Sequence, residues 1–352
     1  MRVLIVGAGP TGLTAAVELA RQGILPDVID RKTDPSSLSR AVGILPHSLN
    51  ILTPCGVTKR LLEEGVRLSE ARFFKGDRRI LTIPLHRAHP QFPFVLALAQ
   101  DRTEAALRDA FRIFGGEVRY GFELTKVRQE GETVLAEING SESEYDYVIG
   151  ADGIRSVTRQ ALAVDYVGHD LPETWSIADV DAVNWPHAKA FTVTLPSPGK
   201  VAVVAPLEAE RFRVVSNTEN ALETLPLPMH ITNIRREGKF RISIRQVTKY
   251  NEGRIFLAGD AAHCHSPVGG RGMNLGIADS VELAHRLVHG GLEGYGSARH
   301  EVGKKTIALS ERGRKIVTAP GAWVRGLVQL TMSGLDFLPM VKHRMARLIL
   351  NG

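Results

Sequence analysis

Cysteine is scarce in this sequence. Cys55 and Cys264 are the only two among 352 residues. A disulfide framework needs more cysteines than this, and few cysteines are typical of proteins from a reducing compartment. The N-terminal run MRVLIVGAGP is also too short and too interrupted by glycine for a secretory signal. We therefore expect a cytoplasmic protein.

Long apolar runs and blocks of like charge are missing as well. No segment reaches the ~18 uninterrupted apolar residues of a membrane-spanning helix. Basic residues number 44 against 38 acidic ones, a net charge of +6. This excess could favour an anionic ligand such as a nucleotide, although a solvated basic surface explains it better. Aromatic residues make up 6% and do not alternate with basic clusters, so nucleic-acid binding has no support.

The sequence does contain a dinucleotide-binding fingerprint. Residues 2–6 form an apolar strand, and Gly7, Gly9 and Gly12 of GAGPTG follow it. A helical pattern and a second strand come next, and that strand ends at Asp30, 18 residues after Gly12. The glycines allow a tight turn, close approach of a pyrophosphate and close helix packing, and the acid binds a ribose hydroxyl. The fingerprint alone does not distinguish NAD from FAD.

Two further apolar strands each lead into an acid. Residues 145–150 precede Asp152-Gly153, which is either a plain turn or part of a polar cluster facing a cofactor. Residues 255–258 precede Asp260, a glycine-rich turn containing Pro267, and a helical pattern. A strand, a carboxylate, a glycine-rich loop and a helix N-terminus suit an anionic or carbonyl-rich cofactor.

The middle of the chain has a different character. Residues 71–98 contain short strands that suggest a hairpin, at residues 71–74, 80–85 and 94–98. Residues 166–250 contain alternating strands separated by prolines, at residues 191–195, 201–205, 211–216 and 240–245. The second pattern is typical of an antiparallel, half-exposed sheet. Such a sheet is a natural platform for a substrate, although apolar packing between domains explains it equally well.

Past residue 290 the chain is helical and basic. Packing of its apolar face on the protein's own core is favoured over membrane association. That face comprises Trp323, Leu327, Leu330, Leu335, Met340, Val341 and Met345.

Three motifs in this order carry a resemblance: GAGPTG, GADGIRSVTR and GDAAHCHSPVGGRGMNLG. Together they resemble the class A flavoprotein aromatic hydroxylases, which share the p-hydroxybenzoate hydroxylase-like fold. The sequence looks closest to the phenol and polyketide hydroxylases, over residues 1 to about 300. The resemblance implies an α/β (α+β) protein, in which a Rossmann-like FAD domain carries an inserted antiparallel substrate domain and a C-terminal helical segment. The expected boundaries are 1–70, 99–165 and 251–290 for the FAD domain, 71–98 and 166–250 for the substrate domain, and 291–352 for the helical segment.

The resemblance implies non-covalent FAD, with NADPH or NADH as a transient electron donor, and it assigns cofactor-binding positions. Around the pyrophosphate and the adenosine ribose they are Gly7, Gly9, Pro10, Thr11, Gly12, Asp30 and Arg31, with Arg40 at a phosphate. Gln100 lies near the ribityl and pyrophosphate region, Asp152 in a motif linked to FAD and pyridine nucleotide, and Asp260 at the ribityl chain. At the pyrimidine edge of the flavin they are Gly270, Gly272, Met273 and Asn274.

The sequence departs from this family in several places. Arg271 stands where glutamine is usual, and residues 217–238 look shortened, so part of the substrate cover is expected to be missing or reshaped. The family's Tyr-x-x-Glu-Arg survives as Tyr295 and Arg299, with Ala298 in place of the acid. We also expect no thioredoxin-like C-terminal domain of the kind found in the phenol hydroxylases.

The activity implied is hydroxylation of an aromatic or polyketide-like molecule with NAD(P)H and O2, through a flavin C4a-hydroperoxide. Pro267 and Arg271 are the candidate catalytic residues, because their loop should face the flavin. His263 and His265 are better explained by loop geometry than as acid–base groups or metal ligands, and we expect no metal. We expect a monomer or homodimer.

Three other functions stay open at this point. The first is a flavin enzyme of another reaction type, such as a dehydrogenase, an oxidase or a Baeyer–Villiger oxygenase. The second is a non-catalytic FAD- or ligand-binding protein, and the third is a dehydrogenase that uses only a nicotinamide.

Overall fold

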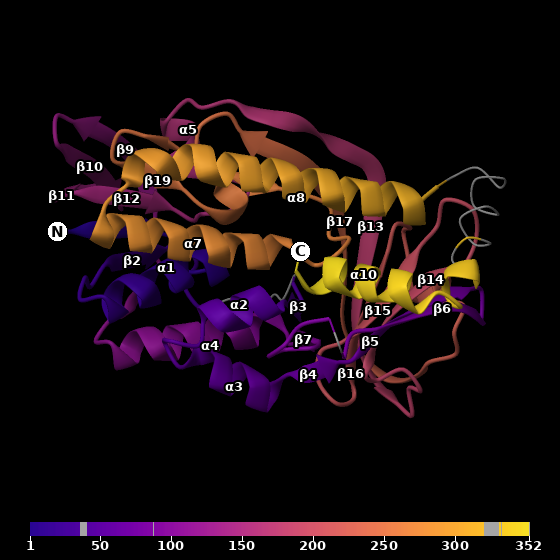
Figure 1. The fold of residues 1–352 in the computed structure, drawn as a ribbon. Coiled ribbons are helices and arrows are strands. Elements are labelled where there is room, and N and C mark those ends of the chain that lie inside the picture. The colour runs from indigo at the N-terminus through magenta and orange to yellow at the C-terminus, as the bar shows by residue number, and fades with distance from the viewer. Residues whose placement is uncertain (36–40, 87, 320–330, 332, 352) are drawn as a thin grey trace.

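The computed structural model of the chain describes residues 1–35, 41–86, 88–319, 331 and 333–351, and it shows a mixed α/β fold. Two large sheets lie at opposite ends of the molecule (Figure 1). Helix α8 (Tyr295–Val317) runs from one sheet toward the other, and α10 (Pro339–Leu350) lies over the second. The fold class expected from the sequence is confirmed.

The first sheet has six strands, and four of its five pairings are parallel. Its centre is built from apolar residues buried on both faces, as in doubly wound sheets. In spatial order the strands are β18 (Asn251–Glu252), β19 (Ile255–Leu257), β12 (Tyr147–Gly150), β1 (Val3–Val6), β2 (Asp27–Asp30) and β8 (Val118–Tyr120).

Different layers cover the two faces of this sheet. One face packs against helices, namely α1 (Pro10–Arg21), α4 (Gln100–Ile113) and α7 (Gly272–His289). The other face packs against a small antiparallel sheet formed by β9 (Leu124–Glu130), β10 (Thr133–Ile138) and β11 (Ser141–Tyr145).

The second sheet has eight strands and is antiparallel except where β14 pairs with β5. In spatial order the strands are β20 (His263–Cys264), β17 (His230–Val247), β13 (Tyr166–Val183), β16 (Arg211–Ser216), β15 (Ala202–Pro206), β14 (Ala190–Leu195), β5 (Glu70–Lys75) and β6 (Arg78–Pro84). Sequence reasoning found four of these strands between residues 166 and 250 and missed β13. Its Gly168 and Pro172 resemble breakers, but Pro172 lies where the register with β17 shifts, so it interrupts no ladder bond.

The strand predicted at residues 94–98 does not join the hairpin of β5 and β6. The corresponding strand, β7 (Val95–Ala97), pairs with β3 (Gly43–Ile44) and β4 (Val66–Leu68) in a separate three-stranded sheet. Helices α2 (Pro46–Ile51) and α3 (Val57–Glu64) lie between these segments in the chain. Residues 71–98 thus divide between two sheets, and the expected domain boundaries stay a prediction.

Two faces of the eight-stranded sheet are covered by different parts of the chain. Val215 of β16 packs in a cluster with residues of the long helices α8 (Tyr295–Val317) and α10 (Pro339–Leu350). Val214, the preceding residue, packs in another cluster with Ala221 and Leu227. Because successive side chains of a strand point to opposite faces, α8 and α10 cover one face and residues 221–229 cover the other.

The predicted apolar face of the C-terminal segment is only partly buried in the described residues. Leu335 and Met345 pack against the sheet, whereas Met340 is 77% exposed. Trp323, Leu327 and Leu330 lie outside the described residues. None of the helices in the described ranges combines the length and apolarity needed to cross a membrane.

Gly12 permits the close packing of α1 on β1, and it provides a test of the fold. A Cβ at this position would overlap the carbonyl oxygen of Gly7 and crowd Ile5. Overpacking costs about 1–3 kcal/mol and exceeds the gain of up to about 1 kcal/mol from higher helix propensity. We expect Gly12→Ala to lower the free energy of unfolding in urea by about 2 kcal/mol.

Gly334→Ala is the matched control, since a Cβ there would meet no described atom within 4 Å. Equal stability of the two variants would contradict this account of the packing.

Candidate active site

The three sequence motifs converge at one edge of the six-stranded sheet. Strands β1, β12 and β19 are parallel neighbours, so the loops that follow them lie side by side. Gly7 approaches the carbonyl of Ala151 so closely that a Cβ would overlap it. Gly259 approaches Thr11 in the same way. The site is therefore assembled from segments that are far apart in the sequence.

The first loop leaves a helix N-terminus free. Gly7 has a φ of +105°, and its N–H donates to Ile29 O at 2.8 Å. Helix α1 begins at Pro10, and Gly9 at the N-cap provides no side-chain cap. The N–H groups of the first turn therefore point outward without partners in the helix. A phosphate is the usual ligand of such a terminus.

Asp30 supports this loop directly. Its Oδ2 accepts from Ala8 N at 2.9 Å, and its Oδ1 accepts from Lys32 N at 2.9 Å. Each carboxylate oxygen has capacity for a further bond, so the predicted ribose contact is compatible with this role. Arg31 is exposed beside it, and Arg40 lies outside the described residues.

The second loop holds a carboxylate with one unused oxygen. Asp152 Oδ2 accepts from the N and Oγ1 of Thr158, at 3.0 and 3.1 Å. Asp152 Oδ1 is buried and has no hydrogen-bond partner among the residues described. The nearby Arg159 is already engaged, because it donates to Ala261 O at 2.9 Å and to Ile154 O at 2.7 Å. Arg159 therefore ties the second loop to the third, and Asp152 is the group left to face a ligand.

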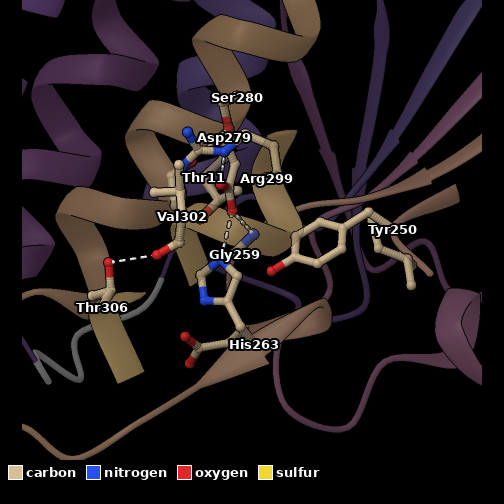
Figure 2. Close-up of polar contacts among 12 residues, drawn as sticks. Thr11, Tyr250, Gly259, His263, Asp279, Ser280, Arg299, Val302 and Thr306 are labelled. Atoms are coloured by element: carbon tan, nitrogen blue, oxygen red, sulfur yellow. Dashed lines mark hydrogen bonds and ion pairs between the residues drawn. The ribbon is translucent and has the colours of Figure 1, made fainter. Parts of the chain in front are cut away.

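The third loop is anchored by a carboxylate that sequence reasoning missed. Asp279 of α7 is fully buried, and its Oδ2 accepts from Gly259 N at 2.9 Å. His263 Nε2 lies 2.6 Å from the same oxygen, and Arg299 Nε donates to Oδ1 at 2.6 Å. Figure 2 shows these groups gathered around the carboxylate, with Tyr250 beside them.

The charges in this cluster compensate one another. Burial alone would raise the pKa of Asp279, but His263 and Arg299 hold it below its usual value. Arg299, which the altered Tyr-x-x-Glu-Arg motif retains, pairs with Asp279 of α7. The retained arginine was the available signal that an acid lies elsewhere. His263 thus has a structural role.

The glycine-rich loop before α7 is held from two sides. Ser310 Oγ of α8 lies 2.9 Å from Ser266 O and 3.0 Å from Val268 O. Asn274 Nδ2 donates to Gly270 O at 2.8 Å and to Gly43 O at 2.9 Å. Helix α7 begins at Gly272 without a side-chain cap, so the N–H groups of its first turn are free. Pro267 is exposed on this loop.

Arg271 extends away from this loop toward the C-terminal helix. Its side chain is buried, with 7% exposed, and Nη2 donates to Leu348 O at 2.8 Å. Its Nη1 is buried and has no partner in the described part of the chain. Burial lowers the pKa of Arg271. A catalytic role for Arg271 or Pro267 stays a prediction.

Gln100 lies at the start of α4 and forms part of a polar pair. Its Oε1 accepts from Ala41 N at 3.0 Å, and its Nε2 donates to Glu104 Oε1 at 2.8 Å. Glu104 is 4% exposed, and burial raises its pKa to about 7. If Gln100 contacts the cofactor as predicted, the titrating carboxyl of Glu104 would be separated from the cofactor only by the Gln100 side chain.

The site fits an FAD molecule in its donors, its acceptors and its space. A Cβ at Gly9, Gly153 or Gly270 would meet no described atom within 4 Å, so open space borders all three loops. Two helix N-termini offer N–H donors for a pyrophosphate and for carbonyl groups. Asp152 and the exposed Asp260 offer acceptors for sugar hydroxyls. Among the described side chains, no three His, Cys, Asp or Glu residues are grouped to hold a metal.

The Asp279 cluster generates one testable prediction. Asp279→Asn leaves the buried Arg299 without a compensating charge, which typically costs about 3–5 kcal/mol. We expect a loss of this size in the free energy of unfolding, measured in urea, and weaker FAD binding. Asp77→Asn, at an exposed acid in the turn between β5 and β6, is the control and should change neither quantity. A loss below about 1 kcal/mol for Asp279→Asn would show that the cluster is not essential.

Glu104 generates a pH-dependent prediction. Its pKa rises from 4.5 to about 7 on folding, so the folded state holds this proton more tightly than the unfolded state. Its contribution to stability is therefore complete below pH 4.5 and is lost as the pH rises through about 7. Glu104→Gln removes this dependence. The free energy of unfolding of the variant apoprotein, relative to that of the wild type, should therefore be higher at pH 8 than at pH 4 by about 3 kcal/mol. Parallel stability curves of the two proteins between pH 4 and 8 would refute this assignment.

Comparison with known proteins identifies the family. Residues 1–224 and 208–310 match the family described as FAD binding domain. The chain is 31% identical to 6-methylpretetramide 4-monooxygenase of Streptomyces rimosus, over 100% of this chain and 68% of that protein. It is 30% identical to pentachlorophenol 4-monooxygenase of Sphingobium chlorophenolicum, over 94% of this chain and 68% of that protein.

Solved structures agree with this result. The p-nitrophenol 4-monooxygenase PnpA from Pseudomonas putida superposes with a TM-score of 0.90, over 99% of this chain and 98% of that chain, at 20% identity. The OxyS anhydrotetracycline hydroxylase from Streptomyces rimosus superposes with a TM-score of 0.81, over 100% of this chain and 76% of that chain, at 26% identity. The chain belongs to the FAD binding domain family, and within it to the class A FAD-dependent aromatic hydroxylases, which are monooxygenases.

Proposed function

We propose that this monooxygenase uses NADPH or NADH and O2 to hydroxylate an aromatic or polyketide-like small molecule. The nicotinamide supplies two electrons, one oxygen atom enters the substrate, and the other leaves as water. The observation that carries the proposal is the meeting of three glycine-containing loops and two uncapped helix N-termini at one sheet edge. Oxygen transfer is proposed to follow the route that the family resemblance implies.

Within this proposal, FAD lies along the edge formed by the three loops. When bound, it would accept electrons from the nicotinamide and react with O2. The N-terminus of α1 would bind the pyrophosphate, because its free N–H groups and partial positive charge favour an anion. The sugar hydroxyls would bond to carboxylates, and the proposed acceptors are Asp30, Asp152 and Asp260.

The N-terminus of α7 would contribute to the chemistry itself. The N–H groups of Gly272, Met273 and Asn274 would stabilise negative charge at the pyrimidine edge of the flavin. Preorganised donors in a site without water can contribute several kcal/mol. Asn274 and Ser310 hold the preceding loop in place, so these donors need not reorganise during the reaction.

The substrate would bind on the face of the eight-stranded sheet that α8 and α10 cover. That face carries Trp175, Phe240 and Phe191 in an apolar cluster. Helix α8 contacts the glycine-rich loop through Ser310, and α10 contacts it through Leu348, so this face adjoins the proposed flavin site. Relatives named for 6-methylpretetramide and pentachlorophenol support a flat, unsaturated substrate.

The division into FAD and substrate domains, a cytoplasmic location and a monomeric or dimeric state are part of this proposal. Oxygen transfer would require the substrate to be enclosed away from water. The C-terminal helices α8 and α10, which pack on the sheet, would provide this cover. Both cysteines are free and buried, which is compatible with a reducing compartment.

The deciding experiment is a screen of phenols and polyketide aromatics for stimulated NADPH or NADH oxidation by the FAD-loaded protein. With ¹⁸O2, we expect one product to gain a single labelled oxygen atom. Asp260→Asn should weaken FAD binding about tenfold or more through the loss of a charged acceptor, whereas Asp77→Asn should leave it unchanged.

Two results would overturn the proposal. Oxidation of the nicotinamide with every compound but no labelled product would point to another flavin reaction. Failure of the purified protein to bind FAD would remove the cofactor site itself.

A further inference from the structure

Arg271 makes an unusual contact for a residue of a cofactor loop. It occupies the N-cap position of α7 but does not cap that helix with its side chain. Instead its guanidinium reaches the last turn of α10 and donates to Leu348 O at 2.8 Å. The last four carbonyls of a helix lack partners within the helix and carry partial negative charge. A cation is therefore well matched to this position. Figure 1 shows the C-terminal end of α10 next to an end of α7.

Burying the Arg271 guanidinium at this contact costs free energy. Arg271 is 7% exposed, its Nη1 is a buried donor without a described partner, and burial is the cause that lowers its pKa. A buried charge normally requires an ion pair and several hydrogen bonds. A glutamine at this position would avoid the free-energy cost of burying a charge. Local stability therefore does not explain the arginine, and a functional role would.

Helix α10 also packs on the eight-stranded sheet. Ala346 and Leu350 are buried against Leu81 and Ile83 of β6. Near the start of α10, Asp336 accepts from Thr82 N at 3.1 Å. Helix α10 is thus anchored to the sheet along its length. Among the residues that the structure describes, its polar contact with the glycine-rich loop is the hydrogen bond from Arg271.

We propose that Arg271 is a positioning residue that docks α10 against the glycine-rich loop, so that α10 forms a wall of the substrate site. The C-terminal end of α10 then joins the sheet that would carry the substrate to the loop that would face the flavin. Docking narrows the site and keeps water from the reacting atoms. This inference rests on the proposed function for its catalytic consequence, but the docking itself does not.

Hydrogen exchange of the FAD-loaded protein tests the docking without any turnover. A hydrogen bond from a charged donor stabilises the docked helix enough to slow its opening about tenfold or more. In Arg271→Met, we expect the amides of residues 340–350 to exchange faster by this factor, while those of β1 and β12 keep their rates. Arg271→Gln should behave likewise because its side chain is shorter, and Arg271→Lys should restore part of the protection.

Two further variants distinguish the loss of α10 docking from the effect of simply removing a positive charge. Arg344→Met removes an exposed cation from the same helix and should leave exchange unchanged. Leu350→Ala removes an apolar anchor of α10 while keeping Arg271, and it should reproduce the faster exchange of Arg271→Met. Unchanged exchange of α10 in Arg271→Met would overturn the docking.

Two measurements test whether α10 is a wall of the site. Iodide quenching of the bound flavin's fluorescence should increase in Arg271→Met and Leu350→Ala, because an undocked helix opens a path for the ion. With the substrate found in the screen, KM should rise, and more of the oxidised nicotinamide should yield H2O2 instead of product. Partial recovery of both properties by Arg271→Lys would distinguish positioning from a loss of fold.

The outcomes distinguish this inference from the proposed function. If no compound is hydroxylated by the wild type, the proposed function fails, whereas exchange and iodide access still test the role of Arg271. If α10 undocks but iodide access, KM and H2O2 yield stay at their wild-type values, the helix is not a wall of the site and the inference is wrong.

Discussion

The arrangement of the cofactor site depends on one buried carboxylate. Asp279 accepts hydrogen bonds from the backbone at Gly259 and from two cationic or polar side chains, His263 and Arg299. These partners lie on the loop after β19, on β20 and on α8, so a single side chain fixes three segments relative to α7. A buried carboxylate is tolerable only with such compensation. The position of the third loop, and hence of Asp260, follows from this cluster.

Much of the cofactor side of the molecule could be predicted from the sequence, because local rules determine it. Gly7 and Gly12 occupy positions where a Cβ would overlap the backbone, so their spacing reports a specific turn. Parallel strands place their following loops at one edge, so Asp152 and Asp260 could be expected near that turn. The same rules explain why the family resemblance was strongest in these three motifs.

The features that escaped prediction depend on contacts between distant residues. Strand β13 contains Gly168 and Pro172 and is held by its neighbours on both sides, which no local pattern reports. Strand β7 has the expected residues but a different partner sheet. The partners of Asp279 come from three separate segments, so no local pattern reports its role. The Arg271 side chain is likewise oriented by a contact with a helix more than 60 residues away in the chain.

The stretch at residues 217–238 looked shortened in the sequence, and the effect of this on the substrate cover stays a prediction. Residues of this stretch, including Ala221 and Leu227, pack with Val214 on the face of the large sheet that α10 does not cover. Shortening there leaves intact the face that carries Trp175 and Phe240, which α8 and α10 enclose. In the proposed function, the cover of the substrate site is therefore formed by the C-terminal helices and depends on their attachment to the glycine-rich loop. A change in that attachment should alter substrate selection more than a change in residues 217–238.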